Sequence, residues 1–150
     1  MKRLFIAGLL AFAPLTWALD QAGSQQLANL QQRWAQIQYQ TPKDKRADAF
    51  EKLAADASTL VHQHPGSAEP LIWEGIINSS WAGATGGLGA LGKVKSAKAS
   101  LEEAMKLDPN ALQGSAYTSL GTLYDQVPGW PIGFGDSDKA DTLLRKALQV

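Results

Sequence analysis

The chain has 150 residues, with 14 Lys and Arg against 14 Asp and Glu, 45% hydrophobic residues, 19% charged residues and no cysteine. This composition is typical of a globular protein, and the length suits a single domain. The lack of cysteine excludes disulfides, cysteine-ligated metal centres, a thiol nucleophile and a lipidated N-terminal cysteine. The balanced charge argues against nucleic acid as a partner, because nucleic-acid-binding proteins carry a basic excess.

Residues 1–18 have the layout of a secretory signal peptide. Lys2 and Arg3 form a positive start, and a proline ends the short apolar run (LFIAGLLAFA) that follows. The run is too short to span a membrane, which takes about 20 apolar residues. We expect cleavage after Ala18 and a mature chain of residues 19–150 with no membrane span, and an uncleaved N-terminal anchor is the alternative. In a Gram-negative host the protein would then be periplasmic.

Apolar residues recur at three- and four-residue spacing through the mature chain, which predicts helices rather than strands. The first helix would carry an apolar stripe of Leu27, Leu30, Trp34 and Ile37, and the second one of Phe50, Leu53, Ala57, Leu60 and Val61. The apolar residues of the third are Leu71, Ile72, Trp73, Ile76, Ile77 and Trp81, and those of the fourth are Val94, Ala97, Leu101 and Ala104. Two more would carry Leu112, Ala116, Leu120 and Leu123; and Ala140, Leu143, Leu144, Ala147 and Leu148. The third helix, from residue 68 to 81, is apolar on several faces and should lie buried between its neighbours.

Proline and acidic residues mark the predicted helix ends. Pro42 ends the first helix, because proline cannot continue a helix and restricts the residue before it. Asp108 is the expected N-cap of the fifth helix, with Pro109 at its first position, and Asp136 or Ser137 is that of the sixth. The sequence therefore predicts an all-α array of three antiparallel pairs. The pairs would span about residues 26–65, 68–109 and 110–150.

The last two predicted pairs repeat one pattern of small and large residues. The repeated positions are Gly75, Ala97, Leu101, Ala104 and Pro109 in one pair, and Tyr117, Leu120, Gly121, Tyr124, Ala140, Leu144 and Ala147 in the other. Small residues there let two helix backbones approach closely, and each pair needs a neighbour to cover its outer face. This order of residues resembles the tetratricopeptide repeat (TPR), which implies a helical-hairpin repeat array. Both hairpins have enlarged turns compared with the family's unit of about 34 residues.

Two segments at these enlarged turns resemble a narrower family. Residues 80–84 (SWAGA) and 127–136 (VPGWPIGFGD) are similar to the exported repeat proteins of the TRAP-transporter-associated T-component family. The resemblance implies a compact bundle with a ligand-sized pore, and a periplasmic solute-binding protein as the partner. The chain differs from many members in lacking a lipidated cysteine.

Large aromatic side chains are the candidate residues for binding a ligand or partner. The loop of residues 127–136 contains two of them, which must be buried or present apolar surface. Trp130 would either plug the end of the bundle or form a binding element, and the sequence leaves both alternatives open. The aromatic residues on helices would line either the core or a concave binding surface. The six candidates are Trp73, Trp81, Tyr117, Tyr124, Trp130 and Phe134.

Other motifs suggest chemistry but have simpler explanations. Residues 87–93 (GLGALGK) fit two nucleotide-binding templates, but a helix rather than a strand is expected before them, and Val94 replaces the hydroxyl residue that binds magnesium. His62 and His64 would point in different directions on a helix and would not chelate a metal together. The acidic clusters are typical of a solvated helix face or a helix start. We therefore predict no cofactor, no metal site and no enzymatic activity.

The sequence predicts an exported, periplasmic scaffold or binding protein. It would capture a protein, a peptide or a small apolar ligand, as an accessory to a solute-uptake system. A repeat array presents an extended surface, and no acid, base and nucleophile converge along the sequence. Two alternatives are a hydrolase that acts on envelope polymers and a purely structural subunit of an envelope complex. Fold analogy alone does not decide between them.

Overall fold

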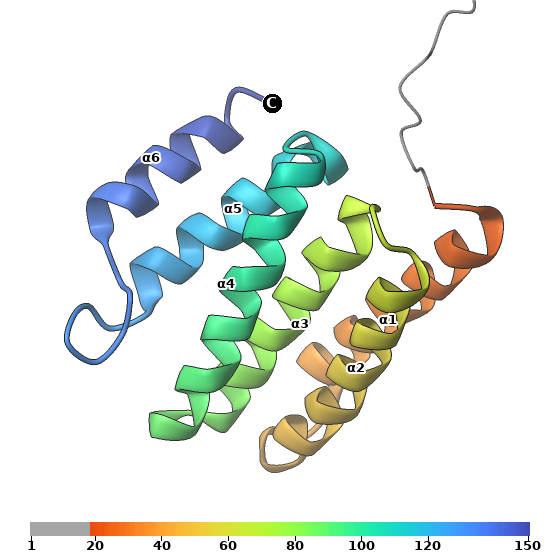
Figure 1. The fold of residues 1–150 in the computed structure, drawn as a ribbon. Helices are drawn as coiled ribbons and strands as arrows, with labels where there is room; N and C mark the ends of the chain where they lie inside the picture. Colours follow the sequence, from red (N-terminus) through yellow and green to blue (C-terminus); the bar gives the residue numbers. More distant parts are fainter. Residues whose placement is uncertain (1–18) are drawn as a thin grey trace, which may run out of the picture.

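The fold consists of helices that follow one another in chain order (Figure 1). The computed structural model describes residues 19–150, so the predicted signal peptide lies outside the described residues. The elements are α1 (Gln21–Gln40), α2 (Lys43–Gln63), α3 (Ala68–Thr85), the short 3-10 helix η1 (Gly87–Gly89), α4 (Ala90–Leu107), α5 (Ala111–Gln126) and α6 (Ser137–Ala147). Residues 19–150 contain no strand, and the predicted all-α fold is confirmed for this range.

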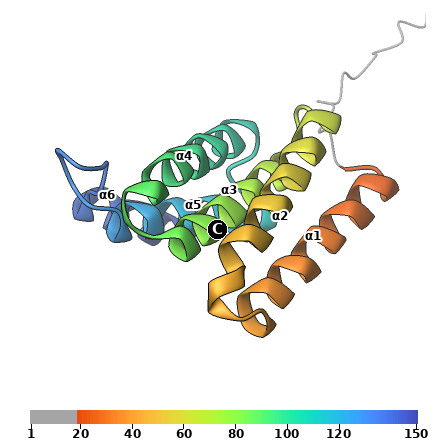
Figure 2. The ribbon, with the colours of Figure 1, turned by 90° about the horizontal axis from the view of Figure 1, so that it is seen from below.

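Consecutive helices form three antiparallel pairs, α1 with α2, α3 with α4 and α5 with α6 (Figure 1). Each pair packs on the next through α2 with α3 and α4 with α5, and α3 also contacts α1 and α5. In Figure 2 the pairs succeed one another across the molecule, which is the arrangement of a helical-repeat array. In the part of the chain that the structure describes, no helix is long and apolar enough to cross a membrane.

Two hydrophobic clusters hold the pairs together, and α3 contributes to both. Phe50 and Leu53 of α2 pack with Ile77 of α3 in the cluster on the α1–α2 side. Ile72 of α3 packs with Leu101 of α4 in the cluster that continues into α5 and α6. All five side chains are almost completely buried. The central position of α3 explains why its sequence is apolar on several faces.

A glycine in α3 and a glycine in α5 make the same close contact with the partner helix. A Cβ atom at Gly75 would lie 2.5 Å from Leu101 Cγ, and one at Gly121 would lie 2.9 Å from Leu144 Cγ. Carbon atoms do not approach so closely, so each contact requires glycine unless the leucine moves. The other repeated positions are buried or half-buried: Ala97, Ala104, Pro109, Leu120, Ala140 and Ala147. The two pairs are therefore geometric repeats of each other at these positions.

The start of α5 departs from the prediction. Asp108 Oδ1 accepts a hydrogen bond from Asn110 N at 2.9 Å, so it caps only a single turn. Leu112, Gln113 and Gly114 then have φ values of 48°, 57° and 71°, in the left-handed region that residues other than glycine rarely adopt. The prediction of a continuous helix from Asp108 is wrong, and Leu112 is exposed rather than part of a buried stripe. Apolar spacing predicts a helix here because it carries no information on the sign of φ.

The start of α6 follows the prediction. Asp136 has an extended backbone, and its Oδ1 accepts a hydrogen bond from Lys139 N at 3.0 Å. Asp138 lies in the first turn, while Arg145 and Lys146 lie in the last. Both signs of charge suit the helix dipole, so the cap and the charges favour the same helix boundaries.

Candidate functional site

The turn between α3 and α4 and the turn between α5 and α6 lie at the same end of the bundle (Figure 1). The predicted end of the third helix at residue 81 is wrong, because α3 continues to Thr85 and includes residues 80–84, so the first turn is shorter than predicted. The turn between α3 and α4 contains Gly86 and Gly87, whose φ values are 67° and 55°. The turn between α5 and α6 is the loop of residues 127–136, which folds back on itself where Gly135 N donates a hydrogen bond to Pro128 O at 3.0 Å. Because residues of both turns line one cavity, two segments far apart in the sequence form a single site.

The cavity between these turns is an open groove of about 600 Å³. Its volume is within the range of about 300–1,000 Å³ that is usual for small-molecule sites. The apolar residues that line it are Ile76, Ala82, Leu88, Ala90, Leu91, Val94, Leu123, Val127, Pro128 and Ile132. Leu88 and Ile132 are 82% and 59% exposed, so they form an apolar rim. We call this cavity the apolar groove.

Among residues 19–150, the side chains that line the apolar groove with polar atoms are all uncharged: Ser79, Ser80, Ser119, Thr122 and Gln126. The hydroxyls of Ser79, Ser80 and Thr122 each donate a hydrogen bond to the carbonyl oxygen four residues earlier, at 2.7, 3.0 and 2.9 Å. A hydroxyl whose proton is engaged can only accept a further hydrogen bond. The groove therefore offers mainly apolar surface, with a few polar contacts from hydroxyls and from the amide of Gln126, which suits the binding of an apolar ligand.

A second cavity, of about 560 Å³, adjoins the apolar groove. Lys43 and Arg46 of α2 are the charged residues that line it, and we call it the cationic cavity. Arg46 Nε donates a hydrogen bond to Thr41 O at 2.8 Å, which holds the guanidinium in place. The two cavities share the lining residues Ser79, Ser80, Gly83 and Gln126. The remaining residues of the cationic cavity are Gln38, Phe50 and Ala84.

The two tryptophans of α3 that the sequence singled out pack on the α1–α2 side of the bundle. Trp73 meets the edge of Trp34 with ring centroids 5.7 Å apart. Trp81 is half-buried against the same cluster, and Lys93 Nζ lies 4.3 Å from its ring centroid. Trp34 Nε1 also donates a hydrogen bond to Ser80 Oγ at 2.8 Å. These contacts give Trp73 and Trp81 a packing role between pairs.

The aromatic residues of α5 and its following loop divide into buried and exposed members. Tyr124 is 4% exposed and meets Phe134 with ring centroids 5.3 Å apart. Tyr117 is half-buried, with Lys146 Nζ 6.0 Å from its ring centroid. Trp130 is 90% exposed. The alternative in which Trp130 plugs the bundle is therefore wrong, and Phe134 takes that place because it is the loop aromatic that packs on Tyr124.

A charged pair borders this aromatic contact. Lys98 Nζ donates a hydrogen bond to Glu102 Oε1 at 2.6 Å and lies 5.9 Å from the ring centroid of Phe134. The hydrogen bond to the Glu102 carboxylate raises the pKa of Lys98, with the charge of Glu102 acting in the same direction and burial opposing both. Lys98 is therefore fully protonated at neutral pH beside the loop that closes the bundle.

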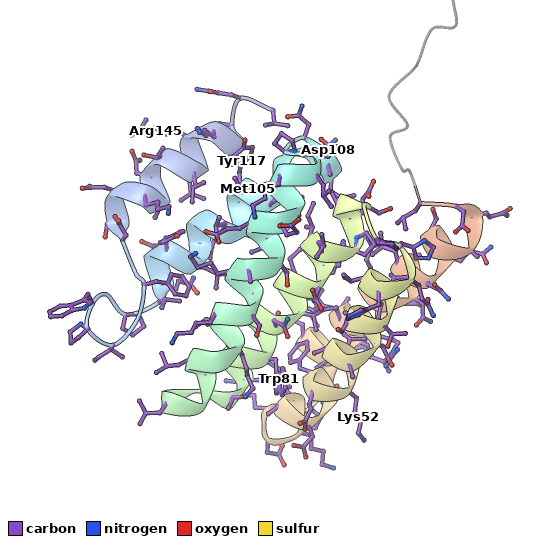
Figure 3. The ribbon with its side chains drawn as sticks, in the orientation of Figure 1. Lys52, Trp81, Met105, Asp108, Tyr117 and Arg145 are labelled. Atoms are coloured by element: carbon purple, nitrogen blue, oxygen red, sulfur yellow. The ribbon has the colours of Figure 1, made fainter. Side chains whose placement is uncertain are left out.

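The six predicted binding residues do not converge on one site. Trp81 and Tyr117 lie at opposite ends of the helices (Figure 3). None of the six lines the apolar groove or the cationic cavity. The residues that sequence reasoning missed are the aliphatic ones of the groove, such as Leu88, Leu123 and Ile132. The sequence feature that could have indicated these residues is the pair of unusual turns. Only the folded chain shows that the two turns lie together.

The motifs set aside on sequence grounds have structural contacts of their own. In the segment of residues 87–93, Lys93 Nζ donates a hydrogen bond to Gly89 O at 3.0 Å, and helix α3 precedes the segment. His62 Nδ1 lies 2.7 Å from Ser58 O within α2. Among residues 19–150, no three His, Cys, Asp or Glu side chains are placed to hold a metal ion.

Comparison of the chain with protein-family models and with curated proteins finds no match. The TPR and T-component resemblances therefore rest on the residues quoted for them.

Proposed function

We propose that the protein is an exported helical-repeat binding protein that holds a small apolar ligand in the apolar groove. The observation that carries the proposal is the groove itself, about 600 Å³ in volume, with aliphatic walls and, among the described residues, no charged side chain in its lining. Burial of apolar ligand surface contributes about 25 cal/mol per Å², which is enough for useful affinity in a pre-formed site of this size. The exposed Leu88 and Ile132 at the rim would be covered by the ligand.

The proposal of binding rather than catalysis rests on the chemistry of the lining. A hydrolase needs a base beside its nucleophile, and among the described residues the side chains that line the groove with polar atoms are the hydroxyls of Ser79, Ser80, Ser119 and Thr122 and the amide of Gln126, none of which is a general base. Export to a periplasm follows from the predicted signal peptide. A role beside a solute-uptake system follows from the T-component resemblance.

Blocking the groove tests this function. Gly83 lines both cavities, and a Cβ there would meet no atom within 4 Å, so Gly83→Trp should fill the space without disturbing the core. Gly92 of α4 has equally free space but lines neither cavity, so Gly92→Trp is the matched control. Binding is measured by the fluorescence of the neutral probe N-phenyl-1-naphthylamine.

We expect saturable binding to the wild type and to Gly92→Trp, and at least tenfold weaker binding to Gly83→Trp. The same melting temperature for both variants would show that the loss is local. Absence of saturable binding to the wild type would contradict the proposal. Equal affinities for the two variants would place the probe elsewhere on the protein.

A protein partner is a second candidate function, favoured by Trp130. This side chain is 90% exposed on a loop that Phe134 anchors to the bundle. An exposed tryptophan on a held loop is typical of a contact that dominates a protein interface. We propose that the partner is a solute-binding protein that docks over Trp130, as the T-component resemblance suggests. Trp130→Ala should then weaken co-purification of that partner without lowering the melting temperature.

A further inference from the structure

The two adjoining cavities differ sharply in polarity. In the part of the chain that the structure describes, the apolar groove has no charged lining residue, whereas the cationic cavity has Lys43 and Arg46 and no acidic residue. They meet at α3 and at the end of α5, where Ser79, Ser80, Gly83 and Gln126 line both. A molecule that occupies both would need an apolar part and an anionic part.

We propose that the natural ligand is a single-chain amphiphile with one anionic head group, whose chain lies in the apolar groove and whose head lies between Lys43 and Arg46. This inference rests on the proposed binding function and adds the class of ligand. The shared chemistry is a carboxylate or a phosphate monoester on an unbranched hydrocarbon chain.

The cationic side chains have donors to spare for such a head group. Arg46 uses Nε for Thr41 O, and within residues 19–150 no hydrogen bond or ion pair engages its two terminal nitrogens or Lys43 Nζ. Guanidinium and ammonium groups bind carboxylates and phosphates through short, charge-assisted hydrogen bonds. Lys43 is exposed and Arg46 is half-buried, and both line the cationic cavity, so an anion that arrives with the ligand could bind to these donors.

The local backbone favours the same charge. Helix α2 begins at Lys43, and its N-cap, Pro42, has no side chain that could cap the helix. Lys45 N donates a hydrogen bond to Pro42 O at 3.0 Å, so the first-turn N–H groups that remain are those of Lys43 and Asp44. The positive end of the helix dipole lies beside the cationic cavity, although the first turn also contains the carboxylate of Asp44. On the far side, the amide of Gln126 stands at the boundary of the two cavities and can donate to the head group.

The hydrocarbon part of the ligand follows from the other cavity. A small soluble anion would leave the exposed Leu88 and Ile132 uncovered and would gain nothing from the aliphatic walls. A neutral apolar molecule would leave Lys43 and Arg46 unpaired. Only an amphiphile would contact both cavities. The volume of an amphiphile with two hydrocarbon chains would exceed that of the groove, which is about 600 Å³.

The test compares decyl chains that differ only in the head group. N-phenyl-1-naphthylamine bound to the full-length protein is displaced at pH 8 with decanoate, decyl phosphate, 1-decanol or decyltrimethylammonium. We expect decanoate or decyl phosphate to displace the probe at least tenfold better than 1-decanol, and decyltrimethylammonium to be weakest. The stronger of the two anions identifies the head group.

The variants assign the preference to the two cations. Lys43→Gln/Arg46→Gln should reduce the preference for the anion over 1-decanol about tenfold and leave 1-decanol unchanged. Lys45→Gln/Lys52→Gln is the matched control, because it removes the same charge from the same helix at residues that do not line the cationic cavity (Lys52 is labelled in Figure 3). If the double variant is unstable, Lys43→Glu alone, on an exposed side chain, makes the same test.

The outcomes separate this inference from the proposed function. If the probe binds and 1-decanol displaces it as well as the anions do, the function stands and the anionic head group is overturned. If both double variants lose the preference equally, the cationic cavity is not the head-group site. If the probe does not bind to the wild type, both the proposed function and this inference are contradicted.

Discussion

The α3–α4 pair and the α5–α6 pair use the same glycine–leucine contact in different surroundings. Gly75 meets Leu101, which is 0% exposed because α4 packs against both α3 and α5. Gly121 meets Leu144, which is 37% exposed because α6 makes extensive contact only with α5. The repeated sequence thus specifies the contact within a pair, but the neighbouring pair decides how much that contact stabilises the fold.

The turns of the two pairs do not repeat, although their helices do. The helices of both pairs share a pattern, whereas the turns have unrelated sequences, GGLG in one and VPGWPIGFGD in the other. Yet both turns line the same apolar groove. The repeat therefore builds the scaffold, and the parts that break the repeat build the candidate site.

The largest expected difference between the pairs comes from the leucines. Leu101→Ala should destabilise the protein by about 2–5 kcal/mol, because it leaves a cavity in the core. Leu144→Ala should cost about 1 kcal/mol or less, because water already reaches that side chain. Urea unfolding of both variants gives the two free energies. Equal losses would contradict the view that the outer pair is the less buried one.

The two glycines should show a smaller difference of the same sign. Gly75→Ala should destabilise by about 1–3 kcal/mol, since its Cβ would overlap the immobile Leu101. Gly121→Ala should cost less than Gly75→Ala, because Leu144 can move outward and alanine favours the helix by about 1 kcal/mol, although the new Cβ would also lie 3.3 Å from Ala140 O. A leucine side chain at this position is too large for movement of Leu144 to make room for it, so Gly121→Leu should destabilise the protein by roughly 1–3 kcal/mol. Thermal melts of the three variants check this order, and an unchanged melting temperature for Gly75→Ala and Gly121→Leu would argue against the close contacts.

The loop of residues 127–136 allows the finest comparison. Phe134→Ala should lower the stability by about 2 kcal/mol, because it removes the edge-to-face contact with Tyr124. Trp130→Ala should change it by no more than about 0.5 kcal/mol, since the side chain is exposed. Chemical denaturation of both variants measures the difference. A larger loss for Trp130→Ala would restore the alternative in which that residue plugs the bundle.

Much of the fold was predictable because it depends on local spacing. Helix stripes such as Leu27, Leu30 and Ile37 are buried as predicted, and Asp136 caps α6. The repeat alone predicts the close helix contacts of Gly75 and Gly121, since glycine inside a helix is unfavourable unless a close approach requires it. These features need no knowledge of distant parts of the chain.

The site was less predictable because it depends on contacts between distant segments. The left-handed turn at Leu112 is invisible to apolar periodicity, and the choice between Phe134 and Trp130 as the buried loop aromatic depends on the position of Tyr124. In the sequence, an aliphatic residue such as Leu88 cannot be distinguished from an ordinary surface or core residue. Its place in the groove depends on how the two turns lie in the folded chain. The sequence favours large aromatic side chains as binding residues, but the groove is lined by aliphatic and small polar side chains.

Chemical-shift mapping by NMR tests most directly whether the two turns act as one ligand site. Decanoate is titrated into isotope-labelled protein, and the backbone amide shifts are followed. We predict that the shifts concentrate in two separate stretches, residues 83–94 and residues 119–132, with a smaller group around Lys43 and Arg46. Shifts in only one of the two turns, or shifts spread evenly over the three pairs, would contradict a shared site.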